Sequence, residues 1–213
     1  HAIHTVPDRN HGYCIDDNAR ALILACMLTD AGETALPEAL PPRFAGFLQH
    51  AFNPATGRFR NFMGFNRTWL EEQGSDDSHG RALWALGVCA ARTADPPGRA
   101  WAARLFRAGL PVVAGFLSPR AWGFTLLGLA EYCAATPGDH DAAALQHVLA
   151  DRLLARLAAA QAAGWIWFED RLAYDNARLA QALIATGAAT GRRDLATAGL
   201  AALRWLVAMQ TAP

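Results

Sequence analysis

Residues 13–22 read YCIDDNARAL, which places two carboxylates, an amide and a guanidinium at the start of an apolar run. Related stretches return at residues 77–83, which read DSHGRAL, and at residues 174–180, which read YDNARLA. Each copy lies where a polar loop gives way to a run rich in Ala and Leu. The repetition predicts three helices that begin with similar polar side chains.

These three copies allow a local explanation and a functional one. An Asp at the start of a helix accepts hydrogen bonds from the free N–H groups of the first turn. An Arg three or four residues later lies on the same face of the helix and can pair with that Asp. A helix cap with an ion pair therefore accounts for any single copy, whereas three copies together favour a shared site. Both interpretations stay open at this point.

The composition is typical of one globular domain. The chain has 213 residues, of which 53% are hydrophobic, and its formal net charge is zero. This length is sufficient for a single domain with a buried core over residues 1–213. The neutral balance gives no electrostatic reason to expect binding to nucleic acid or to an anionic membrane. No apolar run is long enough to predict a transmembrane helix.

The cysteines and the N-terminal segment give an indication of the cellular location. Four cysteines are scattered along the chain without a CxxC pair, and three of them, Cys26, Cys89 and Cys133, lie in apolar runs. Buried thiols of this kind favour a reducing, cytoplasmic environment. The N-terminal segment lacks the charged and then apolar pattern of a signal peptide. Because the chain starts at His1 and stops abruptly at Pro213, we expect both ends to be cuts within a larger protein.

Pro, Gly and polar residues divide the chain into eight predicted helices. Their ranges are residues 17–31, 41–52, 78–92, 95–116 with a bend at Pro111, 118–135, 137–163, 175–189 and 194–209. Residues 58–63 alternate between polar and apolar side chains and predict a short strand or one arm of a hairpin. We expect strands to hold less than about a tenth of the residues.

The predicted helices alternate in character. The first, third, fifth and seventh are rich in small residues and poor in charge, which is typical of helices buried on both sides. The second, fourth, sixth and eighth carry more charge and predict an outer layer. The inner helices recur roughly every 45–60 residues, as in arrays of helix pairs. The sequence therefore predicts an all-α chain of α/α hairpins, with the positive dipole ends of the inner helices on one side.

Residues suited to carbohydrate collect in the loops before these helices. Aromatic rings can stack on the C–H faces of a sugar, carboxylates and amides bind its hydroxyl groups, and carboxylate pairs cleave glycosidic bonds. The alternative is that each Trp packs in the core and that the neighbouring Glu71 and Glu72 are simply solvated. The residues in question are His4, Asn61, Trp69, Glu71, Glu72, Trp122, Trp165, Trp167 and Glu169.

Other classes of site find little support in the sequence. His1, His4, His11 and Cys14 match no closed zinc pattern, so we predict no metal site. No GxSxG, GxGxxG or P-loop motif occurs, and no cofactor is predicted.

Long motifs in this chain resemble a known group of proteins. They are residues 4–22, NFM at 61–63, WLE at 69–71, GSDDSHGRALW at 74–84, WFED at 167–170 and YDNAR at 174–178. Together they resemble the all-helical six-hairpin domain of bacterial carbohydrate-active proteins, which often follows a glycosyltransferase domain. The resemblance covers nearly the whole chain.

This resemblance implies an (α/α)6 toroid of the six-hairpin glycosidase-like type, a carbohydrate ligand and a covalently linked glycosyltransferase domain as a partner. A full toroid of six hairpins contains more helices than the eight predicted here. We therefore expect a partial toroid that lacks its last hairpins, with open flanks that would favour self-association.

Three functions stay open. A glycoside hydrolase-like domain would use one carboxylic acid and one carboxylate, and the candidate catalytic residues are Asp16, Asp17, Asp77 and Glu169. A non-catalytic module would hold a glycan for an attached glycosyltransferase. A sugar epimerase or isomerase would use histidines as proton carriers, such as His4 and His79. Candidate substrate-binding residues are His4, Tyr13, Arg20, Asn61, Trp69, His79, Arg81, Trp167 and Asp175, with Asp175 also expected to cap a helix.

Geometry distinguishes these functions. Two carboxyl groups about 5–10 Å apart across an open cleft favour hydrolysis. Paired histidines that face one cleft favour isomerisation, and carboxylates that are all held by arginines favour binding or a structural role. We expect the loops before the first, third and seventh helices to converge on one cleft, with Trp69 or Trp167 as its aromatic wall.

Overall fold

The computed structural model describes residues 2–32, 40–160 and 164–211. Within these ranges the chain forms eight α-helices. They are α1 (Ile15–Asp30), α2 (Leu40–Ala51), α3 (Asp76–Arg92), α4 (Pro96–Gly109), α5 (Pro119–Ala135), α6 (His140–Ala160), α7 (Ala177–Thr190) and α8 (Arg193–Gln210). The all-α prediction is confirmed. The predicted end of the sixth helix at 161–163 and the candidate ligand His1 lie outside the described residues.

Local capping explains where several helices begin. Ser75 Oγ accepts a hydrogen bond from the Ser78 N–H at 3.1 Å, and Asp95 Oδ2 accepts one from the Gly98 N–H at 2.8 Å. Pro96 and Pro119 occupy the first turns of α4 and α5, where a missing N–H costs nothing. The bend expected at Pro111 is a full break, because α4 ends and a 3-10 helix, η2 (Pro111–Gly115), follows.

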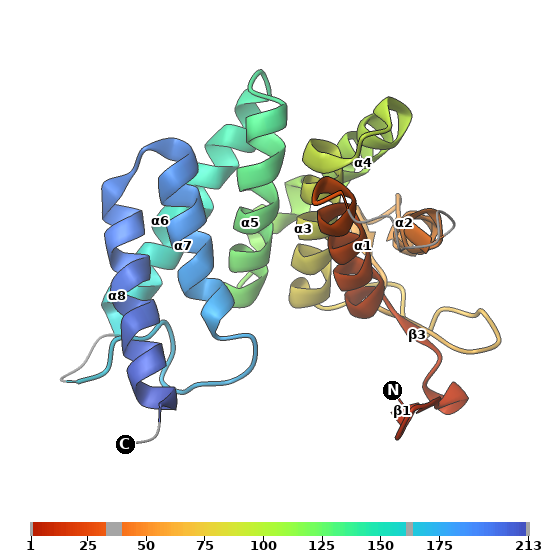
Figure 1. Cartoon of the computed structure of the whole chain (residues 1–213), viewed down its shortest axis with the longest axis horizontal. Coiled ribbons are helices and arrows are strands. Elements are labelled where there is room, and N and C mark those ends of the chain that lie inside the picture. Colours follow the sequence, from red (N-terminus) through yellow and green to blue (C-terminus); the bar gives the residue numbers. More distant parts are fainter. Residues whose placement is uncertain (1, 33–39, 161–163, 212–213) are drawn as a thin grey trace.

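The helices form two layers. The inner helices α1, α3, α5 and α7 lie side by side in that order, so that each packs against the next. On the outer side, α2 packs on α1, α4 on α3, α6 on α5, and α8 on α7. Figure 1 shows that all four inner helices begin at the lower side of the molecule. The alternation read from the sequence therefore corresponds to an inner and an outer layer.

The closest helix pair, α3 and α5, depends on glycine. A Cβ atom at Gly87 would lie 2.3 Å from the carbonyl oxygen of Gly128, and one at Gly128 would lie 2.7 Å from that of Leu83. Real side chains do not tolerate such distances, so glycine allows the two backbones to touch. This contact fixes the separation of the two helices that carry Arg81 and Arg120.

Short strands hold the N-terminal loops against α1. The strands are β1 (Ala2–Ile3), β2 (Val6–Pro7), β3 (Tyr13–Cys14), β4 (Phe52–Asn53), β5 (Arg58–Phe59) and β6 (Phe62–Met63), and a 3-10 helix, η1 (Arg9–His11), lies before β3. β4 and β5 form the predicted hairpin, but β6 pairs antiparallel with the distant β3. This pairing brings the loop after β6 to the start of α1.

The core is continuous along the row of helices. Buried side chains from α1 to α8 form one hydrophobic cluster, in which the rings of Phe106 and Tyr132 stack at 4.4 Å. In the described ranges, no helix combines the length and the apolar character needed to cross a bilayer.

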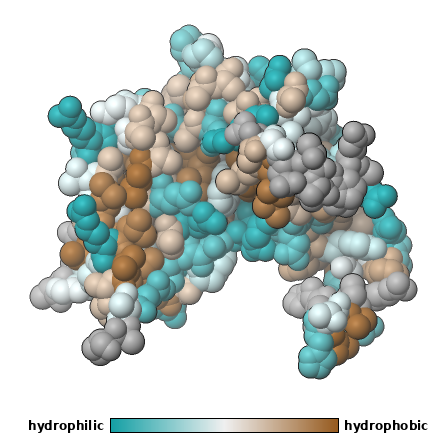
Figure 2. Space-filling view, viewed as in Figure 1, coloured by the Kyte–Doolittle hydropathy of each residue, from teal (hydrophilic) through white to brown (hydrophobic). Residues whose placement is uncertain are grey.

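Apolar side chains are exposed at both ends of the row. Leu24 and Met27 are exposed on α1, and Leu200, Val207 and Met209 are exposed on α8. Figure 2 shows hydrophobic surface over α1 and over the α7–α8 end, with hydrophilic surface between them. These surfaces are where the predicted self-association would take place.

Candidate functional site

Arg81 joins the start of the first inner helix to the segment before the last. Its side chain is only 2% exposed, and its Nε lies 2.9 Å from Asp16 Oδ1. Its Nη1 donates a hydrogen bond of 2.7 Å to Asp175 Oδ2. The guanidinium also lies 4.1 Å from the ring centroid of Phe124 on α5. One arginine on α3 therefore connects α1, α5 and the start of α7.

Arg120 on α5 forms a second centre beside it. Its Nη1 donates to Glu169 Oε1 at 2.9 Å, and its Nε donates to the backbone oxygen of Tyr174 at 2.7 Å. Its Nη2 reaches Asn176 Oδ1 at 3.4 Å. Because these partners all come from residues 169–176, Arg120 shapes the loop that leads into α7.

Asp77 completes the cluster at the start of α3. Its two carboxylate oxygens accept short hydrogen bonds from the hydroxyl groups of Ser118 and Tyr174. Burial raises the pKa of the Tyr174 hydroxyl, and the neighbouring Asp77 carboxylate raises it further. Tyr174 is still 49% exposed, so it presents an aromatic ring to solvent beside a fixed carboxylate.

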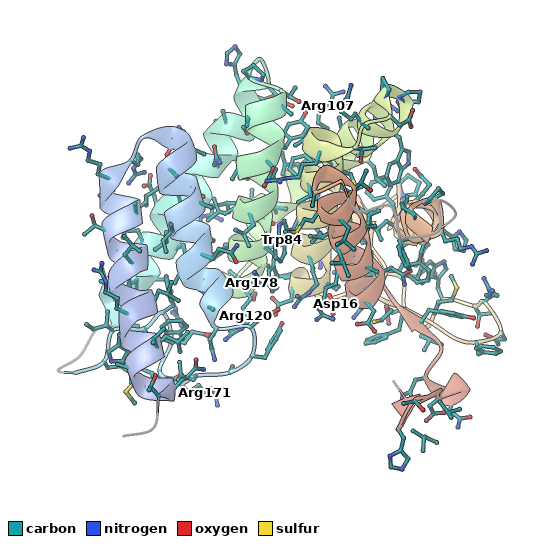
Figure 3. All side chains as sticks on the ribbon, viewed as in Figure 1. Asp16, Trp84, Arg107, Arg120, Arg171 and Arg178 are labelled. Carbon is teal, nitrogen blue, oxygen red and sulfur yellow. The ribbon has the colours of Figure 1, made fainter. Side chains whose placement is uncertain are left out.

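We call this cluster the polar mouth. It consists of Asp16, Asp77, Arg81, Ser118, Arg120, Glu169, Tyr174 and Asp175. Figure 3 shows Asp16 and Arg120 at the lower ends of their helices, on the side where the inner helices begin. The segments before the first, third and seventh helices therefore meet through these side chains, with the start of α5 added, and the cleft expected between them stays a prediction.

A cavity of about 350 Å³ lies deeper along the same helices. Trp84 and Arg178 line it one helical turn beyond Arg81 and Asp175, and the Arg178 guanidinium lies 4.8 Å from the Trp84 ring centroid. Met27 of α1 and Leu127 of α5 complete the walls. A half-apolar hollow between the four inner helices therefore lies about one helical turn from the polar mouth.

The surroundings of Asp16 shift the pKa of its carboxyl group. Burial raises the pKa of Asp16, while the charges of Arg81 and Arg20 oppose this effect. A carboxyl group whose pKa is raised stays protonated to a higher pH and can act as an acid.

The repeated Asp–Arg motif has different partners in its copies. Asp17 and Arg20 pair at 2.8 Å, but Asp17 is 66% exposed on α1 and lies outside the mouth. Arg178 was expected to pair with a carboxylate, and this is wrong within the described part of the chain. It stacks on Trp84 and donates to Gln181 Oε1 at 2.6 Å. Asp17 and Asp175 do lie within a turn of helix starts on the same side, as predicted.

Asp175 is not the helix cap that we expected. Its backbone φ of 53° directs the chain away from helical geometry, and its side chain bonds Arg81 instead of the N–H groups of α7. The long-range ion pair therefore replaces the local cap.

His79 packs in the core and does not belong to a ligand site. Its side chain is fully buried, its Nδ1 accepts from the Phe59 N–H at 3.3 Å, and its Nε2 lies 2.8 Å from the carbonyl oxygen of Gly109. Burial lowers the pKa of His79 to about 3, so the ring is neutral. His4 lies on the exposed turn between β1 and β2. These two histidines do not share a cleft.

The predicted aromatic wall is also wrong. Trp167 is fully buried, where it packs edge-on against Phe168 and lies 5.9 Å from Trp205 of α8. Trp69 packs against Phe47 and His50, on the α2 side of α1. Both rings fill gaps under loops, and the aromatic residues at the mouth and its cavity are Tyr174 and Trp84.

Two more predicted binding residues lie away from the mouth. Asn61 is buried, where its backbone oxygen accepts from the Ile15 N–H at 2.9 Å and its N–H donates to Glu71 Oε1. Tyr13 lies on the far side of α1 against Phe65. Asn61 and Glu71 hold the loop after β5, which explains both residues without a ligand.

Sequence reasoning missed Arg120, Ser118, Tyr174 and Trp84. A signal for Arg120 was present, because it follows the Ser-Pro start of the fifth helix, near where Arg20, Arg81 and Arg178 stand in theirs. In the ranges that the structure describes, no group of three or more His, Cys, Asp or Glu side chains is arranged to hold a metal ion. The mouth offers hydroxyl, carboxylate and guanidinium groups, which suit a ligand rich in hydroxyl groups.

No family model matches the chain, and no curated protein matches it.

Proposed function

We propose that this chain is part of an (α/α)6-type toroid and that its polar mouth binds a carbohydrate. The row of inner helices covered by outer helices is the unit that such a toroid would repeat around a ring. The mouth supports binding of a glycan, since fixed carboxylates can accept hydrogen bonds from sugar hydroxyl groups. The exposed ring of Tyr174 adds a surface for the apolar face of a sugar.

One observation favours glycan binding over glycan hydrolysis. The mouth carboxylates are held by other side chains: Asp16 and Asp175 by Arg81, and Glu169 by Arg120. A guanidinium that touches a carboxylate stabilises its charge and fixes its position. Carboxylates whose positions are fixed in this way offer ordered hydrogen-bond acceptors, which is the requirement for recognition. A linked glycosyltransferase domain in the cytoplasm would then supply the glycan.

A specific observation favours hydrolysis as the second candidate function. Burial raises the pKa of Asp16, as a general acid requires. Because Asp16 and Asp175 both touch the guanidinium of Arg81, their carboxyl groups lie within roughly 10 Å of each other, inside the range that glycoside hydrolases use.

The test combines glycan-array binding with a product assay on the intact protein. We expect the wild type to bind a defined set of glycans and to release no product. Tyr174→Phe removes one hydroxyl group and should weaken binding about tenfold. Asp17→Asn, an exposed carboxylate outside the mouth, is the matched control and should bind normally.

The other outcomes are equally informative. Product formation that Asp16→Asn abolishes would replace binding with hydrolysis as the function. A wild type that neither binds nor cleaves any glycan would overturn both.

A further inference from the structure

A second hollow lies on the other face of α1. A groove of about 690 Å³ runs between α1, α2 and the loop after β6, and its lining includes Tyr13, Asn18, Arg43, Phe47, His50 and Arg67. Asn18 and Asp16 are two residues apart on a helix, so they point roughly 200° apart. The groove is therefore separate from the polar mouth, which begins at Asp16. Its volume falls in the range of small-molecule sites, about 300–1,000 Å³.

Positive charge is concentrated in this groove although the whole chain is neutral. Among the described residues, Arg43 and Arg67 line it, and no carboxylate does. Within the described residues, neither guanidinium has a carboxylate at ion-pair distance. The other arginines around the loops of this region are occupied, as Arg58 is by Asp76 and Arg60 by Glu72. Two guanidinium groups that have no carboxylate partner among the described residues, beside one hollow, favour an anionic ligand.

The loop after β6 holds Arg67 in a backbone conformation that is unfavourable in free energy. Arg67 has a φ of 69°, a conformation that side chains other than glycine rarely adopt. Its N–H donates to the Gly64 oxygen at 2.9 Å, and its guanidinium lies 5.1 Å from the Tyr13 ring centroid. This geometry directs a cation over the groove wall and keeps it at the level of the aromatic rings.

Aromatic rings form the wall beside these cations. Tyr13 stacks on Phe65 with 5.8 Å between ring centroids and lies 6.4 Å from Phe47, which in turn meets Trp69 edge-on at 5.6 Å. These four rings form one continuous chain of contacts, which makes a rigid apolar surface. A ligand that fits both features has an apolar ring face and a planar anion.

We propose that this groove binds the uronic acid unit of an acidic glycan. The sugar ring would lie against Phe47, and its carboxylate would take paired hydrogen bonds from Arg43 or Arg67. His50 and Asn18 supply polar groups for the hydroxyls at the rim. This site rests on the proposed carbohydrate function, since it would bind an acidic unit of the same class of ligand at a place separate from the mouth.

The test is calorimetric titration of the intact protein with an oligogalacturonide and with a neutral oligosaccharide of equal length. We expect the acidic ligand to bind, and each of Arg43→Gln and Arg67→Gln to weaken that binding about tenfold. Binding should also weaken as salt is raised. Arg104→Gln on α4, which removes an exposed arginine outside the groove, is the matched control and should change nothing.

Further arms separate this proposal from the function of the mouth. Tyr174→Phe should leave oligogalacturonide binding unchanged, and the groove variants should leave neutral-glycan binding unchanged. If the wild type binds the neutral oligosaccharide as tightly as the oligogalacturonide, the groove proposal alone would be overturned. In a different outcome, inorganic phosphate or a sugar phosphate binds as tightly as the oligogalacturonide and depends equally on Arg43 and Arg67. That result would overturn the assignment of a uronic acid as the ligand and would indicate a general anion site.

Discussion

Arg81 and Asp175 are 94 residues apart in the chain, yet the Arg81 Nη1 and the Asp175 Oδ2 atoms lie 2.7 Å apart at the polar mouth. With Asp16 on the other side of the guanidinium, this contact ties α1 to α7 through α3. The same three side chains form part of the proposed glycan site, so stability and recognition depend on one network.

Removal of Arg81 should destabilise the fold more than removal of an exposed arginine. Arg81→Ala leaves Asp16 and Asp175 without their cation in a largely buried site, and loss of one partner of a buried pair costs about 3–5 kcal/mol. Since both carboxylates are about 30% exposed and water compensates in part, we expect about 2–3 kcal/mol in urea unfolding. Arg20→Ala breaks an exposed pair and should cost less than about 1 kcal/mol. Equal costs for the two variants would contradict this account.

His79 should make the free energy of unfolding depend on pH. The pKa of His79 is about 3 in the fold and 6.5 in its absence, so the unfolded state takes up a proton first as the pH falls. Its contribution is complete above pH 6.5 and is lost towards pH 3, by up to about 1.4 kcal/mol for each pH unit.

The measurement for His79 is urea unfolding at a series of pH values. His79→Gln keeps a donor and an acceptor but does not titrate, so its stability should fall less steeply between pH 6 and pH 4. The exposed His50 provides the control, and His50→Gln should follow the wild type. Parallel curves for all three proteins would rule out the buried neutral ring.

Cys26 and Cys89 should form a disulfide on mild oxidation. Their sulfur atoms lie 3.2 Å apart between α1 and α3 and line a cavity of about 530 Å³ that admits small reagents. The hydrogen bond with Cys89 lowers the pKa of Cys26, so Cys26 forms a thiolate at a lower pH than an ordinary thiol does. Hydrogen peroxide should remove two hydrogens from the pair and be reduced to water.

Peptide mapping without reductant measures this crosslink. The linked peptide should appear faster at pH 8 than at pH 6 and should be absent from Cys26→Ser. Burial raises the pKa of Cys133 to about 11, so Cys133→Ser serves as the control and should crosslink normally. Separate oxidation of Cys26 and Cys89 without any linked peptide would count against the prediction.

The exposed apolar ends should cause self-association. Leu24 and Met27 on α1 and Val207 on α8 are more than half exposed. Light scattering should show a mass that increases with concentration, and Leu24→Glu with Val207→Glu should reduce it. Val148→Glu, an exposed apolar position on α6, is the control. A wild type that stays monomeric at all concentrations would be inconsistent with this expectation.

The positions of the helices could be predicted because their signals are local. Asp95 before Pro96 and Ser118 before Pro119 cap the first turns that follow them, and neither requires knowledge of distant residues. The alternation of charge among the helices indicated the two layers for the same reason. Helix α7 begins two residues later than predicted, because Asp175 is drawn into its long-range bond with Arg81.

The residues of the candidate site could be predicted from the sequence, but their partners could not. The repeated motif was sufficient to single out Asp16, Asp77, Arg81 and Asp175, because a polar cluster before an apolar run is visible in the sequence. Their partners were not, since Asp175 lies three residues from Arg178 and yet bonds Arg81 on another helix. Ion pairs between helices depend on which helices pack together, and here the glycine contact of α3 with α5 sets that arrangement.

Burial was decided by tertiary structure alone. His79 and Trp167 stand in motifs that suit a sugar site, but Phe59, Phe116 and Gly109 enclose the first, and Trp205 covers the second. Those partners come from distant segments that the sequence does not connect. The sequence therefore determined which residues start each helix and carry its charge, and the packing of the helices decided which of them face a ligand, because exposure depends on neighbours in space.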